Sequence, residues 1–180
     1  HTINNLKQLL RMQESELLRL STANEEMVAE LAKFRAAQLG FVFQSFNLID
    51  ELTIEENVAL GLAYRKEAAG NKAERVASAM DTVSIGHRAR HFPHQLSGGQ
   101  QQRAAIARAI VGQPKLILAD EPTGNLDTAN GEQVMNILTA LNDEGATIVM
   151  VTHSPSHADM AKRRIDMLDG RIVASAMRAI

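Results

Sequence analysis

Hydrophobic residues in the first 38 positions recur at alternating spacings of three and four. The apolar members of this seam are Ile3, Leu6, Leu10, Leu17, Leu20, Met27, Leu31 and Phe34, and its two remaining positions hold Gln13 and Asn24. The same stretch contains no glycine and no proline, the residues that most often interrupt helices. The pattern predicts a long helix over residues 3–38 with one apolar stripe.

Two packing modes fit this stripe. A helix, or a pair of helices, can pack the stripe on its own domain, or the stripe can pair with a partner in a coiled coil. We favour packing on the same domain, because the seam is short and two of its positions are polar. Ser21 and Thr22 lie four and three residues before Glu25, so a helix could end and restart there.

From Leu39 onwards, short apolar runs alternate with stretches of helical periodicity. The runs predict strands at 41–43, 115–120 and 147–152, and the periodicity predicts helices at 55–65, 71–83, 97–111 and 128–142. Near the end, apolar residues 165–168 and 171–173 flank the turn pair Asp169-Gly170, which predicts a hairpin. Alternating strands and helices indicate the α/β class with a mainly parallel sheet.

Composition removes several kinds of function. The 180 residues contain no cysteine, which excludes disulfides, thiol nucleophiles and thiolate metal sites. No apolar run approaches the roughly 18 residues of a membrane-spanning helix. A formal net charge of −2 provides no general attraction to nucleic acid.

Candidate chemistry begins at Leu96-Ser97-Gly98-Gly99-Gln100. Ser97 stands where a helix N-cap is expected, and two glycines follow it. The free N–H groups of a helix N-terminus bind phosphate, and glycine lets phosphate approach the backbone. The alternative is a capping box between Ser97 and Gln100 that only starts the helix.

Polar residues also follow each of the three predicted strands. Asp120-Glu121 ends the second, His153 follows the third and Gln44 follows the first. Such sheets carry their chemistry at the carboxyl ends of the strands, where acids hold Mg²⁺ or activate water. Taken singly, each residue fits an ordinary polar turn equally well.

Together, these motifs resemble the nucleotide-binding domain of ABC transporters from about Leu18 to the end of the chain. The matching motifs are the Q-loop at Gln44, the signature motif at 96–103, the Walker B strand at 116–121, the D-loop at Asn125-Leu126-Asp127 and the switch histidine at His153. Residues 41–48 and 121–127 look like the lipoprotein-release and macrolide-export subgroup.

The resemblance implies a P-loop-NTPase-like α/β domain over 39–180, with a helical subdomain at about 50–112, preceded by the helical segment 1–38. It also implies an ATP-binding subunit that joins a second ATPase domain head to tail. Such a subunit would couple ATP hydrolysis to export by a membrane permease, with ATP and Mg²⁺ as cofactors and no nucleic acid. It would lie on the cytoplasmic side of a bacterial membrane.

By the same resemblance, four signature residues act in trans on the partner's ATP: Ser97, Gly98, Gly99 and Gln100. Three residues are catalytic within the chain: Glu121 polarises water, His153 stabilises developing charge and Gln44 assists. Asp120 and Gln44 hold Mg²⁺. The D-loop residues Asn125, Leu126 and Asp127 line the dimer contact.

The chain departs from the family pattern in one respect. A P-loop of the form Gly-x-x-x-x-Gly-Lys-Ser/Thr should precede Gln44, but no glycine precedes Gly40 and no Gly-Lys pair occurs. Without the phosphate cradle, we expect the chain alone to be inactive and the sheet to be incomplete on its N-terminal side. The helix 3–38 is then expected to cover the exposed side of that sheet.

Three functional hypotheses follow. The chain belongs to an energising ATPase, or it is a non-hydrolysing partner that donates its signature helix to another chain's ATP site. A third class, the ABC-type ATPases of DNA repair, is disfavoured because no basic stripe appears. A zinc site at His87, His91 and His94 is also disfavoured, since Pro93 disrupts the helical spacing.

Overall fold

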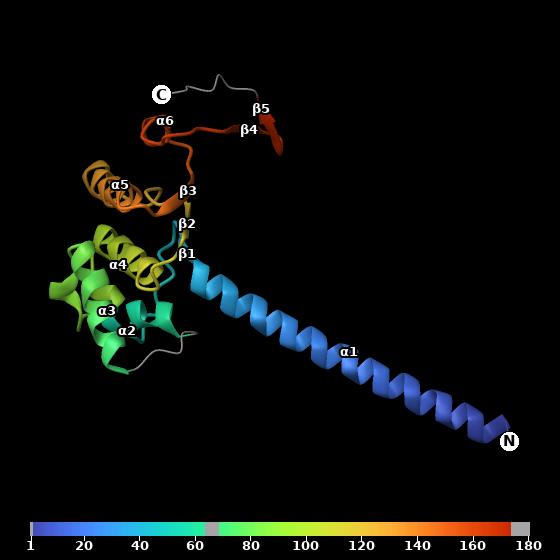
Figure 1. Ribbon diagram of the computed structural model, residues 1–180. Coiled ribbons are helices and arrows are strands. Elements are labelled where there is room, and N and C mark those ends of the chain that lie inside the picture. The colour runs from blue at the N-terminus through green and yellow to red at the C-terminus, as the bar shows by residue number, and fades with distance from the viewer. Residues whose placement is uncertain (1, 64–68, 174–180) are drawn as a thin grey trace.

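The computed structural model describes residues 2–63 and 69–173 (Figure 1). The helices are α1 (Thr2–Gln38), α2 (Ile54–Ala59), α3 (Ala69–Thr82), α4 (Gly98–Ile110), α5 (Thr128–Asp143) and α6 (Pro155–Ala158). The strands are β1 (Leu39–Val42), β2 (Leu116–Asp120), β3 (Thr147–Val151), β4 (Asp166–Leu168) and β5 (Arg171–Val173). Short 3₁₀ turns occupy Leu60–Leu62, Gly86–Arg88 and Pro93–Gln95.

Strands β1, β2 and β3 form a parallel sheet in that order. Phe41 pairs with Leu118, and Leu118 pairs with Val149, so the three strands run in one register. Helices α4 and α5 connect them, as parallel neighbours require. The predicted α/β class with a mainly parallel sheet is confirmed.

The core lies on one face of this sheet. Val42, Ile117 and Ala119 point into it and are almost fully buried. Helix α4 crosses behind β1 and meets α2, α3 and α5, and its residues 104–107 are fully buried. Small alanines on α4 allow its backbone to lie close to β1.

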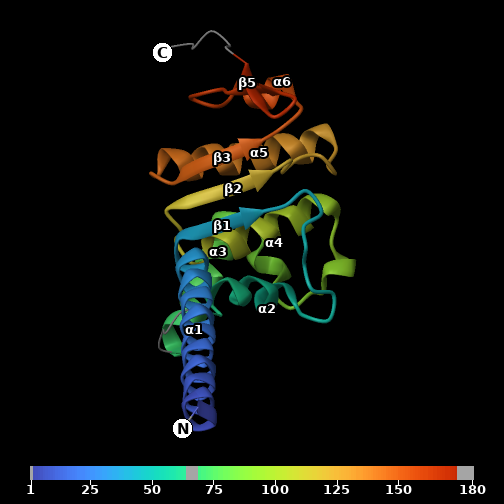
Figure 2. The same ribbon diagram turned by 90° about the vertical axis from the view of Figure 1, so that its right-hand side faces the viewer.

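The opposite face of the sheet is open. Phe41 is 41% exposed and Val149 is 52% exposed, and the neighbouring Leu118 is only half-buried. In Figure 2 the three strands face the viewer, and helices α4 and α5 lie behind them. Parallel sheets normally carry a layer on both faces, so this apolar face is an unfilled packing surface.

Helix α1 forms as predicted, but its predicted packing is wrong. It is continuous for 37 residues and extends away from the sheet, meeting it only near β1 (Figure 1). Leu20 and Phe34, two described seam side chains, are 64% and 65% exposed. The helix therefore does not cover the open sheet face. Local sequence encodes the stripe, but it does not encode the direction of the helix axis.

The expected restart at Ser21–Glu25 is also absent. Thr22 donates its hydroxyl hydrogen bond back to the carbonyl oxygen of Leu18, 2.9 Å away. This bond satisfies the hydroxyl inside a helix without breaking it, so the residue does not act as a cap. The side chains of Ile3, Leu6, Leu10, Gln13 and Leu17 lie outside the part that the structure describes.

Most other predicted elements lie within two residues of their expected bounds. The exception is the helix predicted at 55–65, which changes into a 3₁₀ turn after Ala59, and Arg65 lies outside the described residues. The predicted hairpin turn is confirmed, since Asp169 and Gly170 both have positive φ. None of the described helices has the length and apolar character needed to cross a bilayer.

Candidate functional site

Glu121 occupies the turn that follows β2. Its φ is 44°, a left-handed conformation that non-glycine residues seldom adopt, and its N–H donates to the carbonyl oxygen of Val151 at 3.0 Å. This link holds the turn against the end of β3, where His153 follows. The carboxylate Oε1 of Glu121 lies 3.5 Å from Nε2 of His153.

The two members of this pair differ in exposure. The side chain of Glu121 is 17% exposed, whereas that of His153 is 95% exposed. Oε1 of Glu121 is buried and accepts no hydrogen bond. A buried carboxylate oxygen without a donor is costly, so the geometry favours a donor such as water at this position.

Gln44 lies beside the same turn. Its Nε2 donates to Oδ1 of Asn125 at 3.2 Å, and Nδ2 of Asn125 donates back to the carbonyl oxygen of Gln44 at 3.1 Å. Gly124 provides the room, because a Cβ there would stand 2.7 Å from Nε2 of Gln44. The predicted Q-loop and D-loop residues are therefore in direct contact.

Ser97 caps helix α4. Its hydroxyl accepts from the N–H of Gln100 at 3.4 Å, and the Gln100 side chain accepts from the N–H of Ser97 at 3.1 Å. This is the capping box that the sequence left as an alternative to phosphate binding. The cap does not exclude a phosphate role, because the remaining N–H groups at the helix start stay available.

The D-loop lies against this helix start. A Cβ on Gly98 would lie 3.6 Å from Leu126, and one on Gly99 would lie 2.1 Å from Oδ1 of Asn130. Asp127 caps α5, accepting from the N–H of Asn130 at 2.8 Å. Hydrogen bonds from the Asn130 backbone and side chain hold the pKa of the Asp127 carboxyl below its usual range. Both glycines thus allow two helix N-termini to approach each other.

Sequence reasoning missed two side chains of α4 that hold this region together. Gln102, fully buried, donates from Nε2 to the carbonyl oxygens of Phe43 and Pro122. Arg108 donates to the carbonyl oxygens of Phe46 and Asn47, and burial lowers the pKa of its guanidinium. Gln102 and Arg108 each stand close to alanines in a stretch with helical periodicity, and this pattern could have indicated that their polar side chains are at least partly buried.

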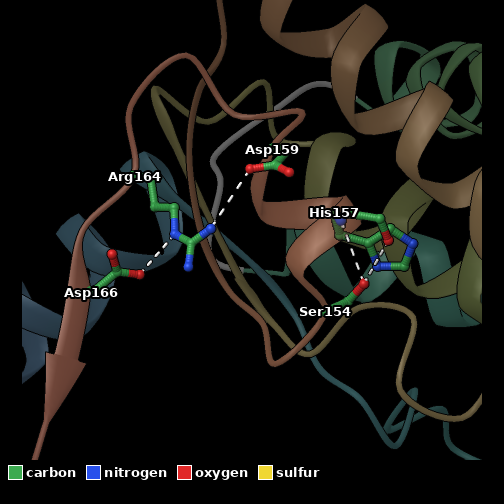
Figure 3. A network of polar contacts seen from close by, with 6 residues as sticks. Ser154, His157, Asp159, Arg164 and Asp166 are labelled. Atoms are coloured by element: carbon green, nitrogen blue, oxygen red, sulfur yellow. Dashed lines mark hydrogen bonds and ion pairs between the residues drawn. The ribbon is translucent and has the colours of Figure 1, made fainter. Parts of the chain in front are cut away.

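The segment after His153 contacts the loop that follows β2 and is also held by contacts within itself. Ser154 caps the short helix α6, and Nδ1 of His157 lies 3.0 Å from the hydroxyl of Thr123. Arg164 then contacts Asp159 and Asp166, which Figure 3 shows on either side of it. The Asp166 carboxylate raises the pKa of the Arg164 guanidinium. These contacts stabilise the approach to β4 without adding to the strand-end cluster.

The strand-end residues offer oxygen donors. The Asp120 carboxylate is exposed at the end of β2, and the Gln44 amide nitrogen is held by Asn125, which leaves its oxygen as the donor. Within residues 2–63 and 69–173, no three acidic or histidine side chains gather into a metal site. A small number of protein oxygens is enough for Mg²⁺, because this ion keeps several waters and also binds substrate phosphates.

Comparisons with known proteins show the family to which the chain is related. The family model described as ABC transporter matches residues 2–124. YknY of Bacillus subtilis, named an uncharacterized ABC transporter ATP-binding protein, is 50% identical over 147 residues, covering 82% of this chain and 64% of its own. The macrolide export ATP-binding/permease protein MacB of Rhodospirillum rubrum is 45% identical over 148 residues, covering 82% of this chain and 23% of its own.

A solved structure gives the same answer for the fold. The ATP-binding cassette MJ0796, described as a dimeric post-hydrolysis state bound to ADP and Pi, superposes with a TM-score of 0.75 at 41% identity. The match covers 84% of this chain and 68% of that one. The chain belongs to the ABC transporter family and has the fold of its ATP-binding domain. Its relatives include macrolide exporters, in line with the subgroup indicated by its motifs.

The match to relatives is partial. The chain spans 64% of the length of YknY and 58% of YvcR, a second Bacillus subtilis ABC transporter ATP-binding protein. The P-loop motif is missing from the printed sequence, and the sheet has an open face.

Proposed function

We propose that this chain supplies the carboxylate, Q-loop, switch and signature parts of an ABC-type ATP site that energises export through a membrane permease. The buried Oε1 of Glu121, which accepts no hydrogen bond and lies 3.5 Å from Nε2 of His153, carries the proposal. A general base needs an oxygen held toward its proton donor and free of other bonds.

In this proposal, each strand end has one role. Glu121 orients and polarises the attacking water, and His153 stabilises charge that develops on the terminal phosphate. Asp120 and Gln44 are the oxygen donors that would hold Mg²⁺, which neutralises phosphate charge when bound. The contact between Gln44 and Asn125 orients the amide so that its oxygen is free.

The signature residues act on a partner. The signature residues are the cap and first turn of α4: Ser97, Gly98, Gly99 and Gln100. Asn125 and Leu126 lie beside Gly98, so one surface carries both motifs. The neighbouring structure MJ0796 is described as dimeric and bound to ADP and Pi. We propose a similar head-to-tail pair here, peripheral to a membrane on its cytoplasmic side.

The phosphate cradle has to come from another segment. The open face formed by Phe41, Leu118 and Val149 is where an additional layer would pack. We propose that this face accepts the P-loop segment. We also propose that the chain consists of a helical segment, 1–38, and an ATPase-like domain, 39–180, which contains a helical subdomain at about 50–112.

One observation favours a second candidate function. Because the sequence lacks Gly-Lys altogether, the chain can serve as a non-hydrolysing partner that completes another chain's site through Ser97–Gln100. Joining the P-loop segment of a relative to this chain separates the two. The first function predicts Mg²⁺-dependent ATP turnover by the joined protein. The second predicts turnover only after a competent ATPase domain is added.

Glu121→Gln is the decisive variant in that experiment. It removes the base and keeps the shape, so turnover should fall at least about 100-fold while ATP remains bound. Asn142→Leu, at the far end of α5, is the matched control and should retain turnover. Unchanged turnover in Glu121→Gln would contradict the assignment of the base.

A further inference from the structure

Gln102 is a fully buried polar residue in the core. Its amide nitrogen donates to the carbonyl oxygen of Phe43 at 3.3 Å and to that of Pro122 at 2.6 Å. Two carbonyl acceptors fix the orientation of the amide, because only its nitrogen can donate. The side chain therefore bridges the end of β1 and the turn after β2.

Both carbonyls adjoin proposed site residues. Phe43 directly precedes Gln44, and Pro122 directly follows Glu121. We propose that Gln102 is a positioning residue that fixes Gln44 relative to Glu121. The inference rests on the proposed ATPase function, because the separation of these two groups sets where Mg²⁺ and the attacking water lie.

A second set of hydrogen bonds joins the same two loops on the solvent side. Asn125 exchanges two hydrogen bonds with Gln44, but it is exposed. Exposed hydrogen bonds exchange with water, so the buried Gln102 bridge contributes the greater part of the rigidity. The Gln44 loop is thus held from inside by one amide and from outside by another.

Gln102 also belongs to the helix that starts with the signature residues. It lies in the second turn of α4, whose cap is Ser97. A helix moves as a rigid element over this distance, so displacement of its N-terminus shifts the amide and the two carbonyls that it holds. Gln102 therefore connects the surface that meets the partner's ATP with the hydrolytic groups of its own chain.

The test compares Gln102→Met with the control Asn142→Leu in this chain. Both replace a side-chain amide by an apolar group of similar length, and both remove hydrogen bonds to backbone carbonyls. Amide hydrogen exchange, followed by NMR, reports on the N–H groups of Phe46 and Gly124. These donate to the carbonyl oxygens of Phe43 and Glu121.

A positioning role predicts that both amides exchange at least tenfold faster in Gln102→Met and are unchanged in Asn142→Leu. The side-chain NH₂ signals of Gln44 and Asn125 should also move to solvent-exposed values only in Gln102→Met. If that variant does not fold, Gln102→Asn keeps the amide but is one methylene shorter, and the same amides should exchange faster.

Two results would overturn the proposal. One is exchange that rises evenly over α4 and β2 in Gln102→Met, which indicates general loosening. The other is unchanged exchange at Phe46 and Gly124. When the chain is joined to a P-loop segment, the proposal also predicts that Gln102→Met lowers kcat at least tenfold relative to the unsubstituted joined protein, with unchanged KM for ATP. Absence of turnover before any substitution would count against the proposed function, while the exchange result would still decide the role of Gln102.

Discussion

At the scale of single residues, the site depends on side chains and backbone angles that the surrounding turn imposes. Glu121 has a φ of 44°, and its N–H is tied to Val151, so the carboxylate leaves the backbone at a fixed angle. Left-handed non-glycine residues persist only where neighbours hold them. Here Gln102 donates a hydrogen bond to the next carbonyl oxygen, that of Pro122, and so helps to hold the residue that we propose as the base.

Asp127 provides a prediction on pH. Its folded-state pKa lies below the usual carboxyl value because Asn130 donates to its charged form. The ionised cap therefore adds stability above the unfolded-state pKa of about 4, and this contribution is lost as pH falls through the lower folded-state pKa. Asp127→Asn keeps the cap without the charge. Wild type should melt at a higher temperature than Asp127→Asn at pH 6, and this advantage should shrink as the pH falls below about 4.

Thermal unfolding followed by circular dichroism measures this difference over the same pH range. A difference in melting temperature that is independent of pH would mean that the carboxylate charge contributes nothing to the cap.

At the scale of elements, close backbone contacts place α4 against the sheet. A Cβ on Gly40 would stand 2.6 Å from the carbonyl oxygen of Ala109, a backbone atom that cannot rotate away. The strand β1 can therefore approach α4 only because residue 40 is glycine. The position of Gln102, and with it the bridge to Phe43 and Pro122, follows from this approach.

Gly40→Ala should thus destabilise the fold by about 1–3 kcal/mol through overpacking. Gly131→Ala is the matched substitution, since its Cβ would meet nothing nearer than 3.7 Å and lies inside α5. Loss of backbone freedom in the unfolded chain should make it more stable by about 0.5–1 kcal/mol. Urea unfolding measures both. Equal stability of the two variants would refute the role given to the Gly40 contact.

Sequence alone predicted most elements because their signals are local. The apolar strands, the Ser97 cap and the Asp169-Gly170 turn depend on neighbours within a few positions. It did not predict which glutamine of Gln100-Gln101-Gln102 is buried, because all three occur in one polar run. It also misplaced α1, since a stripe on a helix does not specify the surface that covers it.

At the scale of the whole molecule, an open sheet face and an incomplete ATP-site sequence occur together. The side chains of Phe41, Leu118 and Val149 share the face that no described element covers. Val151, next to the site, is 56% exposed on the β3 strand. In the proposed function, one additional segment that carries the P-loop packs on this face and completes the site.

Calorimetric titration of Mg-ATP tests this account most directly. It would be carried out on the Glu121→Gln form of this chain, alone and joined to the P-loop segment of a relative. The account predicts no binding to the chain alone up to millimolar nucleotide, and micromolar binding, about −8 kcal/mol, to the joined protein. Micromolar binding to the chain alone would contradict it, because the phosphates would then be held by residues other than a P-loop.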